Sequence, residues 1–399
     1  MKRKLPGKPS FVGKQQLNIY PADCCVAVAL LCNFLILLGD PLRNDAIVSL
    51  GSRGLILATV VFSAFQAASA IKEKKTKYVQ YVVLLVNAIA ISAVLSGPSA
   101  ILDRVVRLVC FCMLPAYMLL YKDVCNVKLL QKAIYVFNWV CTVLWTLLSF
   151  SWRSHIFYGE YSAITLDDLT LGYANPNQTA MMLMVSFVIA FSAHQRDISK
   201  KQKALYLLQC IWTLYLLYQT DSRTCIIIAG VILALWVTHH IPKIGKGFVT
   251  FIFFLPLIMA FLLLFGGENV RDMLIMGEEL DTGRTDIFRH VLEGLTLRSF
   301  VFGNYARWLG ENLHNSYLSI FASLGIVGLI TYLVFLWKMI MHYFERIDRN
   351  SMPQMIAFLG ILGVIAHGGS EATFLMSGMV YGSMVGLLFV LTLKENDEK

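Results

Sequence analysis

The chain has 399 residues, of which 57% are hydrophobic and 15% are charged, and its formal net charge at pH 7 is +9. This balance excludes a water-soluble globular fold, because the apolar fraction is above and the charged fraction well below those of soluble domains. The apolar residues form long runs between short polar clusters. Such runs are typical of helices that cross a hydrocarbon layer about 30 Å thick. The sequence therefore predicts an all-α integral membrane protein.

Twelve apolar runs along the chain are predicted to be transmembrane helices. The first run follows the basic residues Lys2, Arg3 and Lys4, and no small-residue cleavage site follows it, so it is expected to be a retained span. The expected spans are residues 22–38, 54–71, 78–95, 105–121, 129–150, 178–193, 203–218, 224–239, 247–266, 316–337, 354–366 and 373–393.

The expected organisation is a single polytopic membrane domain over residues 1–399. Spans 1–9 occupy residues 22–266, a large outer loop occupies residues 267–313, and spans 10–12 occupy residues 316–393. Long loops of this kind often carry function.

The large outer loop is expected to contain an amphipathic helix. Ile287, Val291 and Leu295 are spaced four residues apart, so they share one face of a helix over residues 285–295. Charged side chains lie off that face. The pattern predicts a helix that lies on the membrane surface.

The basic residues predict that both termini lie in the cytoplasm. In that orientation 23 of the 34 lysines and arginines fall in inner segments, every lysine among them. This inner charge is expected to face anionic lipid and not nucleic acid. Either the lysines only enforce topology, or arginine is used outside because its planar guanidinium binds phosphate bidentately. The outer basic residues are Arg43, Arg53, Arg104, Arg107, Arg153, Arg223, Arg271, Arg284, Arg289, Arg298 and Arg307.

Three polar junctions precede spans on the outer side: residues 171–179 before span 6, 219–224 before span 8 and 311–317 before span 10. Because even-numbered spans begin outside, their unpaired backbone N–H groups and positive dipole ends point to one surface. Taken alone, each junction also fits an ordinary turn or cap. The expected helix caps are Asn177, Ser222 and Asn315.

Arginine and histidine side chains accompany these junctions. Arg223 and Arg284 make the surface suitable for a pyrophosphate group. A histidine at a helix N-terminus, such as His314, is biased toward its neutral form and can accept a proton. The alternative for His314 is a role in packing or capping alone.

The short outer turn between spans 11 and 12 contains His367 and Glu371. These side chains could orient an acceptor sugar, or the segment could be a loop with no further role. The sequence contains no HExxH, CxxC or Walker motif. No catalytic metal and no cofactor is therefore expected.

The order of these motifs resembles the O-antigen ligase and O-antigen polymerase superfamily of bacterial membrane glycosyltransferases. The similarity covers residues 170–345, whereas the first five spans match only in hydropathy. The matching pieces are Asn175-Pro176-Asn177, Ser222-Arg223-Thr224, Gly283-Arg284-Thr285-Asp286-Ile287-Phe288, Phe302-Gly303-Asn304, His314-Asn315-Ser316-Tyr317 and Leu324-Gly325-Ile326-Val327-Gly328.

The resemblance implies a GT-C-like fold and a metal-independent, inverting transfer of a glycan from an undecaprenyl-diphosphate donor. It implies that Arg223 and Arg284 bind the diphosphate and that His314 activates the acceptor hydroxyl. These roles fit the chemistry, because the leaving group is anionic and the acceptor must lose a proton. Further candidates for contact with the donor or acceptor glycan are Asn175, Asn177, Asn315, His367 and Glu371.

The junctions at 175–177 and 314–318 resemble those of capsule and exopolysaccharide polymerases. They favour an enzyme that joins lipid-linked repeat units over an O-antigen ligase, which moves the finished glycan to lipid A core. A flippase or other transporter is the contrary class, but the related halves typical of carriers are not found. The expected location is the bacterial cytoplasmic (inner) membrane, and a chain-length regulator and a flippase are candidate partners.

Overall fold

The computed structural model describes residues 20–42, 44–72, 126–151, 169–173, 176–265, 284–304, 307–308, 313–371 and 379–394. Every regular element within these ranges is a helix, which confirms the all-α class for this part of the chain. The expected spans at 78–95 and 105–121 lie outside the described residues.

Helices lie at the other ten predicted spans and at the predicted loop helix. They are α1 (Pro21–Gly39), α2 (Asp45–Lys72), α5 (Val127–Ser151), α6 (Pro176–His194), α7 (Lys200–Tyr218), α8 (Arg223–Val237), α9 (Lys246–Phe265), α11 (Arg284–Glu293), α13 (Ser316–Arg346), α14 (Met352–His367) and α15 (Met379–Leu391). Two short helices were not predicted: the 3-10 helix η2 (Ile241–Lys243) and α12 (Leu297–Phe302).

Three of the described helices are long and apolar enough to cross a membrane: α5 over Val127–Phe150, α6 and α13. Shorter apolar helices occur at Asp23–Gly39, Arg223–Val237, Lys246–Leu262 and Met352–His367. The chain thus has the helices of a membrane protein, while the total of twelve spans stays a prediction.

The helices α5 and α7 each expose an apolar face along their length. The spacing of three or four residues places these large side chains in a stripe, and an apolar stripe of this size is suited to lipid contact. The exposed residues are Val136, Val140, Val143, Leu147 and Phe150 on α5, and Leu205, Leu208, Ile211, Tyr215 and Tyr218 on α7.

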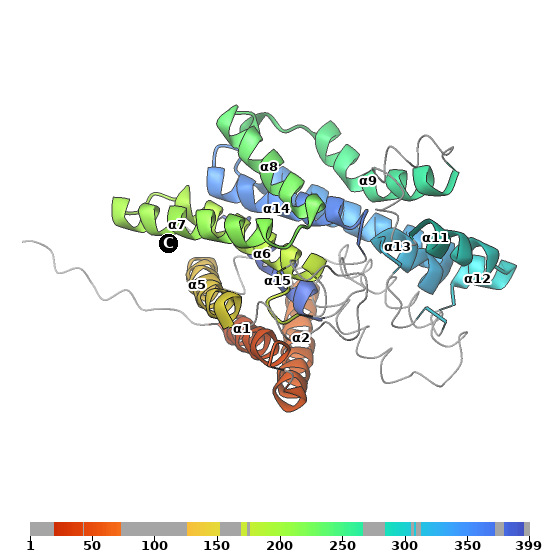
Figure 1. Cartoon of the computed structure of the whole chain (residues 1–399), viewed down its shortest axis with the longest axis horizontal. Helices are drawn as coiled ribbons and strands as arrows, with labels where there is room; N and C mark the ends of the chain where they lie inside the picture. The colour runs from red at the N-terminus through yellow and green to blue at the C-terminus, as the bar shows by residue number, and fades with distance from the viewer. Residues whose placement is uncertain are drawn as a thin grey trace, which may run out of the picture.

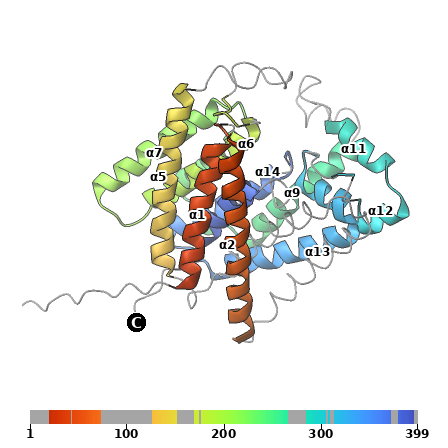
Figure 2. The same cartoon turned by 90° about the horizontal axis from the view of Figure 1, so that it is seen from below.

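The main core is built around α6, which lies at the centre of the molecule together with α14 and α15 (Figure 1). Fifteen consecutive residues of α6, from Thr179 to Ala193, are buried. Gly360 lets α14 approach α6 closely, because a Cβ there would lie 2.5 Å from Val188. On one side, α1, α2 and α5 run next to one another (Figure 2).

Polar side chains tie together helix ends that are predicted to share one side of the membrane. The Asn126 amide donates to Asp23 at 2.8 Å, which joins the starts of α1 and α5. Gln131 Nε2 donates to the carbonyls of Val390 at 3.2 Å and Leu393 at 3.0 Å, which adds the end of α15.

The opposite ends of α1 and α5 meet at Tyr173. Its hydroxyl donates to the Leu37 carbonyl at 2.8 Å and accepts from Trp145 Nε1 at 3.2 Å. Burial raises the pKa of the Tyr173 hydroxyl, so it stays a neutral donor. These contacts group helix ends, while the alternation of the spans and the side that faces the cytoplasm stay predictions.

The helix α13 is broken at Gly325, whose φ of 69° and ψ of −172° are not helical. A first segment, residues 316–324, is therefore separate from the rest of α13, whereas the sequence pattern predicted one continuous span. The outer-loop helices α11 and α12 lie beside α13 at one end of the molecule (Figures 1 and 2).

Candidate functional site

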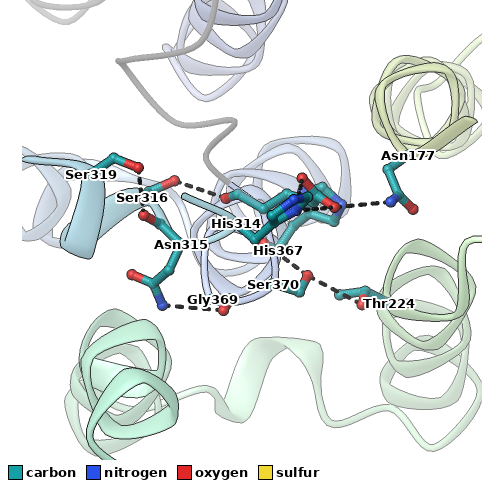
Figure 3. Close-up of polar contacts among 10 residues, drawn as sticks. Asn177, Thr224, His314, Asn315, Ser316, Ser319, His367, Gly369 and Ser370 are labelled. Atoms are coloured by element: carbon teal, nitrogen blue, oxygen red, sulfur yellow. Dashed lines mark hydrogen bonds and ion pairs between the residues drawn. The ribbon is translucent and has the colours of Figure 1, made fainter. Parts of the chain in front are cut away.

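Three helix starts converge on one short turn. The helices α6, α8 and α13 begin at Pro176, Arg223 and Ser316, and the turn at residues 368–371 follows α14. Figure 3 shows side chains from all three starts directed toward this turn. The three outer junctions identified in the sequence therefore lie around one site.

The centre of the site is a contact between His314 and Glu371. His314 Nδ1 lies 3.3 Å from Oε1 and 3.2 Å from Oε2 of Glu371, whose side chain is only 4% exposed. Asn177 Nδ2 donates to Glu371 Oε1 at 2.9 Å. When Glu371 is ionised, Nδ1 of His314 carries the proton, and Nε2 is then the basic nitrogen of the ring.

Backbone contacts hold the turn against α13. The Ser316 amide donates to the Gly368 carbonyl at 2.8 Å, and the Ser316 hydroxyl donates to the Glu371 carbonyl at 3.1 Å. These two bonds fix the start of α13, and with it His314, relative to Glu371. The distance between imidazole and carboxylate is therefore set by the fold.

His314 has a positive φ of 48°, and comparable values occur at Leu171 (52°), Asp221 (51°) and His239 (55°). His314, Leu171 and Asp221 each lie in one of the three junctions, whereas His239 follows the other end of α8. A left-handed conformation costs a residue with a side chain on the order of 1–3 kcal/mol, and it persists only where the surroundings enforce it. Backbone strain of this kind is common at functional sites.

Asn315 caps α13, as predicted. Its Oδ1 accepts from the amides of Tyr317 at 3.0 Å and Leu318 at 2.9 Å. Its Nδ2 donates to the carbonyls of Pro256 at 3.0 Å and Gly369 at 3.1 Å. The side-chain amide of Asn315 is buried, and both its oxygen and its nitrogen are engaged in hydrogen bonds. These contacts give Asn315 a structural role at the site.

The other two predicted caps differ from the expectation. Asn177 is the second residue of α6, after Pro176, so its prediction as a cap is wrong, and its side chain binds Glu371 instead. Ser222 occupies the cap position of α8 but makes no capping hydrogen bond with its side chain.

His367 is the last residue of α14 and is fully buried. Its carbonyl accepts from the amides of Ser370 and Glu371, both at 3.0 Å. The imidazole is packed inside the protein. This position favours a structural role for His367 over direct contact with an acceptor sugar.

The predicted diphosphate-binding arginines have different positions. Arg223 is exposed and begins α8, next to Thr224, whose hydroxyl oxygen accepts from Ser370 Oγ at 3.3 Å. Arg284 begins α11, but its side chain lies outside the described residues, as does the whole of Asn175. A place at the site for the side chains of Arg223 and Arg284 therefore stays a prediction.

Three contacts could not be predicted from the sequence. They are the pairing of Glu371 with His314, the hydrogen bond between Ser370 and Thr224, and the hydrogen bond that Asn177 donates to Glu371. No local pattern carries these contacts, because the partners are far apart in the chain. The only available signal was that each residue is polar and borders an apolar run.

Fold and site together define a helical protein with membrane-spanning segments and a polar cluster where three helices begin. No protein-family model and no curated protein matches this chain.

Proposed function

We propose that this protein is a membrane glycosyltransferase that polymerises undecaprenyl-diphosphate-linked oligosaccharide repeat units into a surface polysaccharide. The site would face the outer side of the bacterial cytoplasmic membrane. The observation that carries the proposal is the convergence of three helix N-termini on the His314–Glu371 pair. In this proposal His314 is a proton acceptor beside positive dipole ends, and the resemblance described above supplies the substrate class.

The donor would bind through its diphosphate. Helix N-termini offer backbone N–H groups and positive dipole ends to an anion, and Arg223 stands at one of them. Arg284 would supply a second guanidinium from the large loop. Two fixed cations stabilise the charge that grows on the leaving diphosphate as the sugar departs.

The transfer would be a single displacement. The acceptor hydroxyl oxygen forms a bond to the anomeric carbon, and the bond from that carbon to the phosphate oxygen breaks. The electron pair leaves on the diphosphate, and the configuration at the anomeric carbon inverts. His314 Nε2 takes the hydroxyl proton, and the Glu371 carboxylate stabilises the imidazolium that results.

A reconstituted assay tests this function. Purified full-length protein in lipid vesicles receives only the undecaprenyl-diphosphate-linked repeat unit, with a His314→Ala variant in parallel. Growth of a lipid-linked chain without a second acceptor is expected, and a chelator should not change it. Transfer only to added lipid A core would indicate a ligase, and movement of the donor across the vesicle without bond formation would indicate a transporter. Either result would overturn the polymerase proposal.

A further inference from the structure

Two glycines let the outer loop cross α13 in direct backbone contact. A Cβ at Gly303 would lie 2.2 Å from the carbonyl oxygen of Ser323. A Cβ at Gly325 would lie 2.3 Å from the carbonyl oxygen of Val301. The contact is reciprocal. Gly303 packs on the peptide group between Ser323 and Leu324, and Gly325 packs on the peptide group between Val301 and Phe302. Real side chains essentially never come this close to backbone atoms, so both positions require glycine.

The backbone conformation requires glycine as well. Gly303 has a φ of 77° and Gly325 a φ of 69°, which residues with a side chain rarely adopt. The Asn304 amide also donates to the Ala322 carbonyl at 2.8 Å, beside the break in α13. We call the contact of residues 301–304 with residues 322–325 the glycine crossing.

A small hydrophobic cluster attaches the same loop to the same segment of α13. This loop cluster joins side chains of α9, α11 and the loop to the first segment of α13, and it is separate from the main core. Its buried residues are Ala260, Val291, Trp308, Leu313, Leu318 and Ala322.

Further contacts reinforce this attachment. Arg307 Nη2 lies 3.0 Å from His290 Nε2, and its guanidinium lies 4.9 Å from the ring centre of Trp308. The rings of Phe300 and Phe321 meet edge to face at 5.7 Å. The loop from α11 onward and the first segment of α13 therefore form one structural unit.

This unit contains two of the residues to which we assign roles. Arg284 begins α11, and His314 stands directly before the capped start of α13. We propose that Gly303 and Gly325 are positioning residues, which hold the α11–α12 loop on α13 so that Arg284, at the donor diphosphate, and His314, at the acceptor hydroxyl, act in the same transfer. The inference rests on the proposed function. Arg223 is independent of the crossing, because α8 reaches the site through Thr224 and Ser370.

The first test needs no enzymatic activity. Hydrogen exchange is measured on the full chain in lipid nanodiscs, using overlapping peptides that resolve the Asn304 amide. We expect Gly303→Ala and Gly325→Ala to speed its exchange at least about 10-fold, because loss of one hydrogen bond at ~1.4 kcal/mol corresponds to that factor. Gly230→Ala is the matched control, since a Cβ there meets nothing within 4 Å.

Phe300→Ala is a milder variant in case the alanine substitutions at the crossing prevent folding. Phe300 is 44% exposed, so the fold should survive its truncation while the ring contact with Phe321 is lost. A smaller increase in Asn304 exchange is expected. Exchange unchanged in every folded variant, or an unprotected Asn304 amide in the parent, would overturn the glycine crossing whatever the protein's function is.

The second test measures coupling in the transfer assay. In the parent, Arg284→Lys and Arg223→Lys are each expected to slow transfer about 5–150-fold. In a Gly303→Ala or Phe300→Ala background, Arg284→Lys should cost less than about 2-fold, whereas Arg223→Lys should keep its full effect. If Arg284→Lys and Arg223→Lys both slow transfer in these backgrounds as much as they do in the parent, the positioning role of the two glycines is overturned. A parent without transfer activity would instead contradict the proposed function, and the exchange result would still stand.

Discussion

The main core and the loop cluster differ in size and meet at the site. Among the described residues, the main core spans ten α-helices and includes Tyr317, while the loop cluster has six buried residues and includes Leu313. His314 lies between these two anchors. Glu371 and Asn177 stand on elements of the main core, and the loop cluster carries the helix that starts at Arg284.

The two regions are expected to have different roles: the main core sets the stability of the protein, and the loop cluster sets the geometry of the site. A large buried core sets the free energy of global unfolding, whereas a small cluster can open locally at a lower free energy. Substitutions in the main core should therefore lower the stability of the whole protein. Substitutions in the loop cluster should mainly disturb how the parts of the site are placed.

The largest effect is expected where the two regions meet. His314→Ala should slow transfer by about 10²–10⁴-fold, the usual contribution of a general base, without loss of inserted protein. His314→Asn should do the same, and asparagine tolerates the positive φ, so strain is not the cause.

His240→Ala is the control for these variants, because His240 is an exposed histidine that follows the C-terminal end of α8, whereas the site lies at the N-terminal end of that helix. It should have near-parental activity. If both His314 variants keep near-normal turnover, His314 is a packing residue and not the general base of the transfer.

A paired truncation tests the separation of the two regions. Phe358→Ala removes a fully buried ring of α14 that packs 5.5 Å from Phe344, at a cost of about 3–5 kcal/mol. Thermal unfolding in detergent should show a clearly lower midpoint. Trp308→Ala should leave that midpoint nearly unchanged but increase protease cleavage within residues 267–313. If Phe358→Ala and Trp308→Ala lowered the thermal unfolding midpoint equally, the main core and the loop cluster would unfold as one unit.

A charge-conserving pair of variants compares the arginines of the two regions. Arg223→Lys and Arg284→Lys should each raise the transfer barrier by about 1–3 kcal/mol, because an ammonium cannot form the bidentate contact of a guanidinium. The measurement is kcat/KM for the lipid-linked donor. Arg53→Lys, at an exposed position on α2, should have no effect. Full activity of both site variants would remove the diphosphate role.

The smallest effect is expected from a polar contact inside the main core. Gln209 Nε2 donates to Thr142 Oγ1 at 2.8 Å and links α7 to α5. Gln209→Leu should lower stability by about 0.6 kcal/mol, the average for such bonds in membrane proteins. Leu208→Ala, on the exposed face of the same helix, should cost less. A more stable Gln209→Leu protein would show that burial of the amide outweighs its hydrogen bond.

Much of the helical fold could be predicted, because apolar runs mark helices directly. The predicted spans at 178–193 and 354–366 differ from α6 and α14 by at most two residues at each end. The start of α2 was missed by nine residues, since polar residues such as Asp45 lower hydropathy without ending a helix. Hydropathy thus detects the apolar part of a helix and not its ends.

The break in α13 could not be predicted from its own sequence. Glycine is frequent inside membrane helices, so Gly325 within an apolar run does not signal a change of direction. The break depends on residues 301–304, which lie some twenty positions earlier in the chain. Contacts of this kind become visible only once the segments are placed in space.

The site was predictable in its local features and not in its pairings. Asn315 could be identified as a cap because capping depends on neighbours within three residues. The contact of His314 with Glu371 spans 57 positions, and that of Asn177 with Glu371 spans 194. His367 is the last residue of α14, directly before this turn, yet its burial depends on packing that its sequence neighbours do not reveal.

The position of α15 has a consequence for biosynthesis. Residues 384–391 of this helix are almost completely buried, and α15 packs against α1, α5, α6 and α14. Ribosomes add about 5–20 residues per second, so α15 is translated roughly 17–70 s after α1. Closure of the bundle, including the bonds from Gln131 to the last carbonyls of α15, therefore waits until residue 393 has been translated.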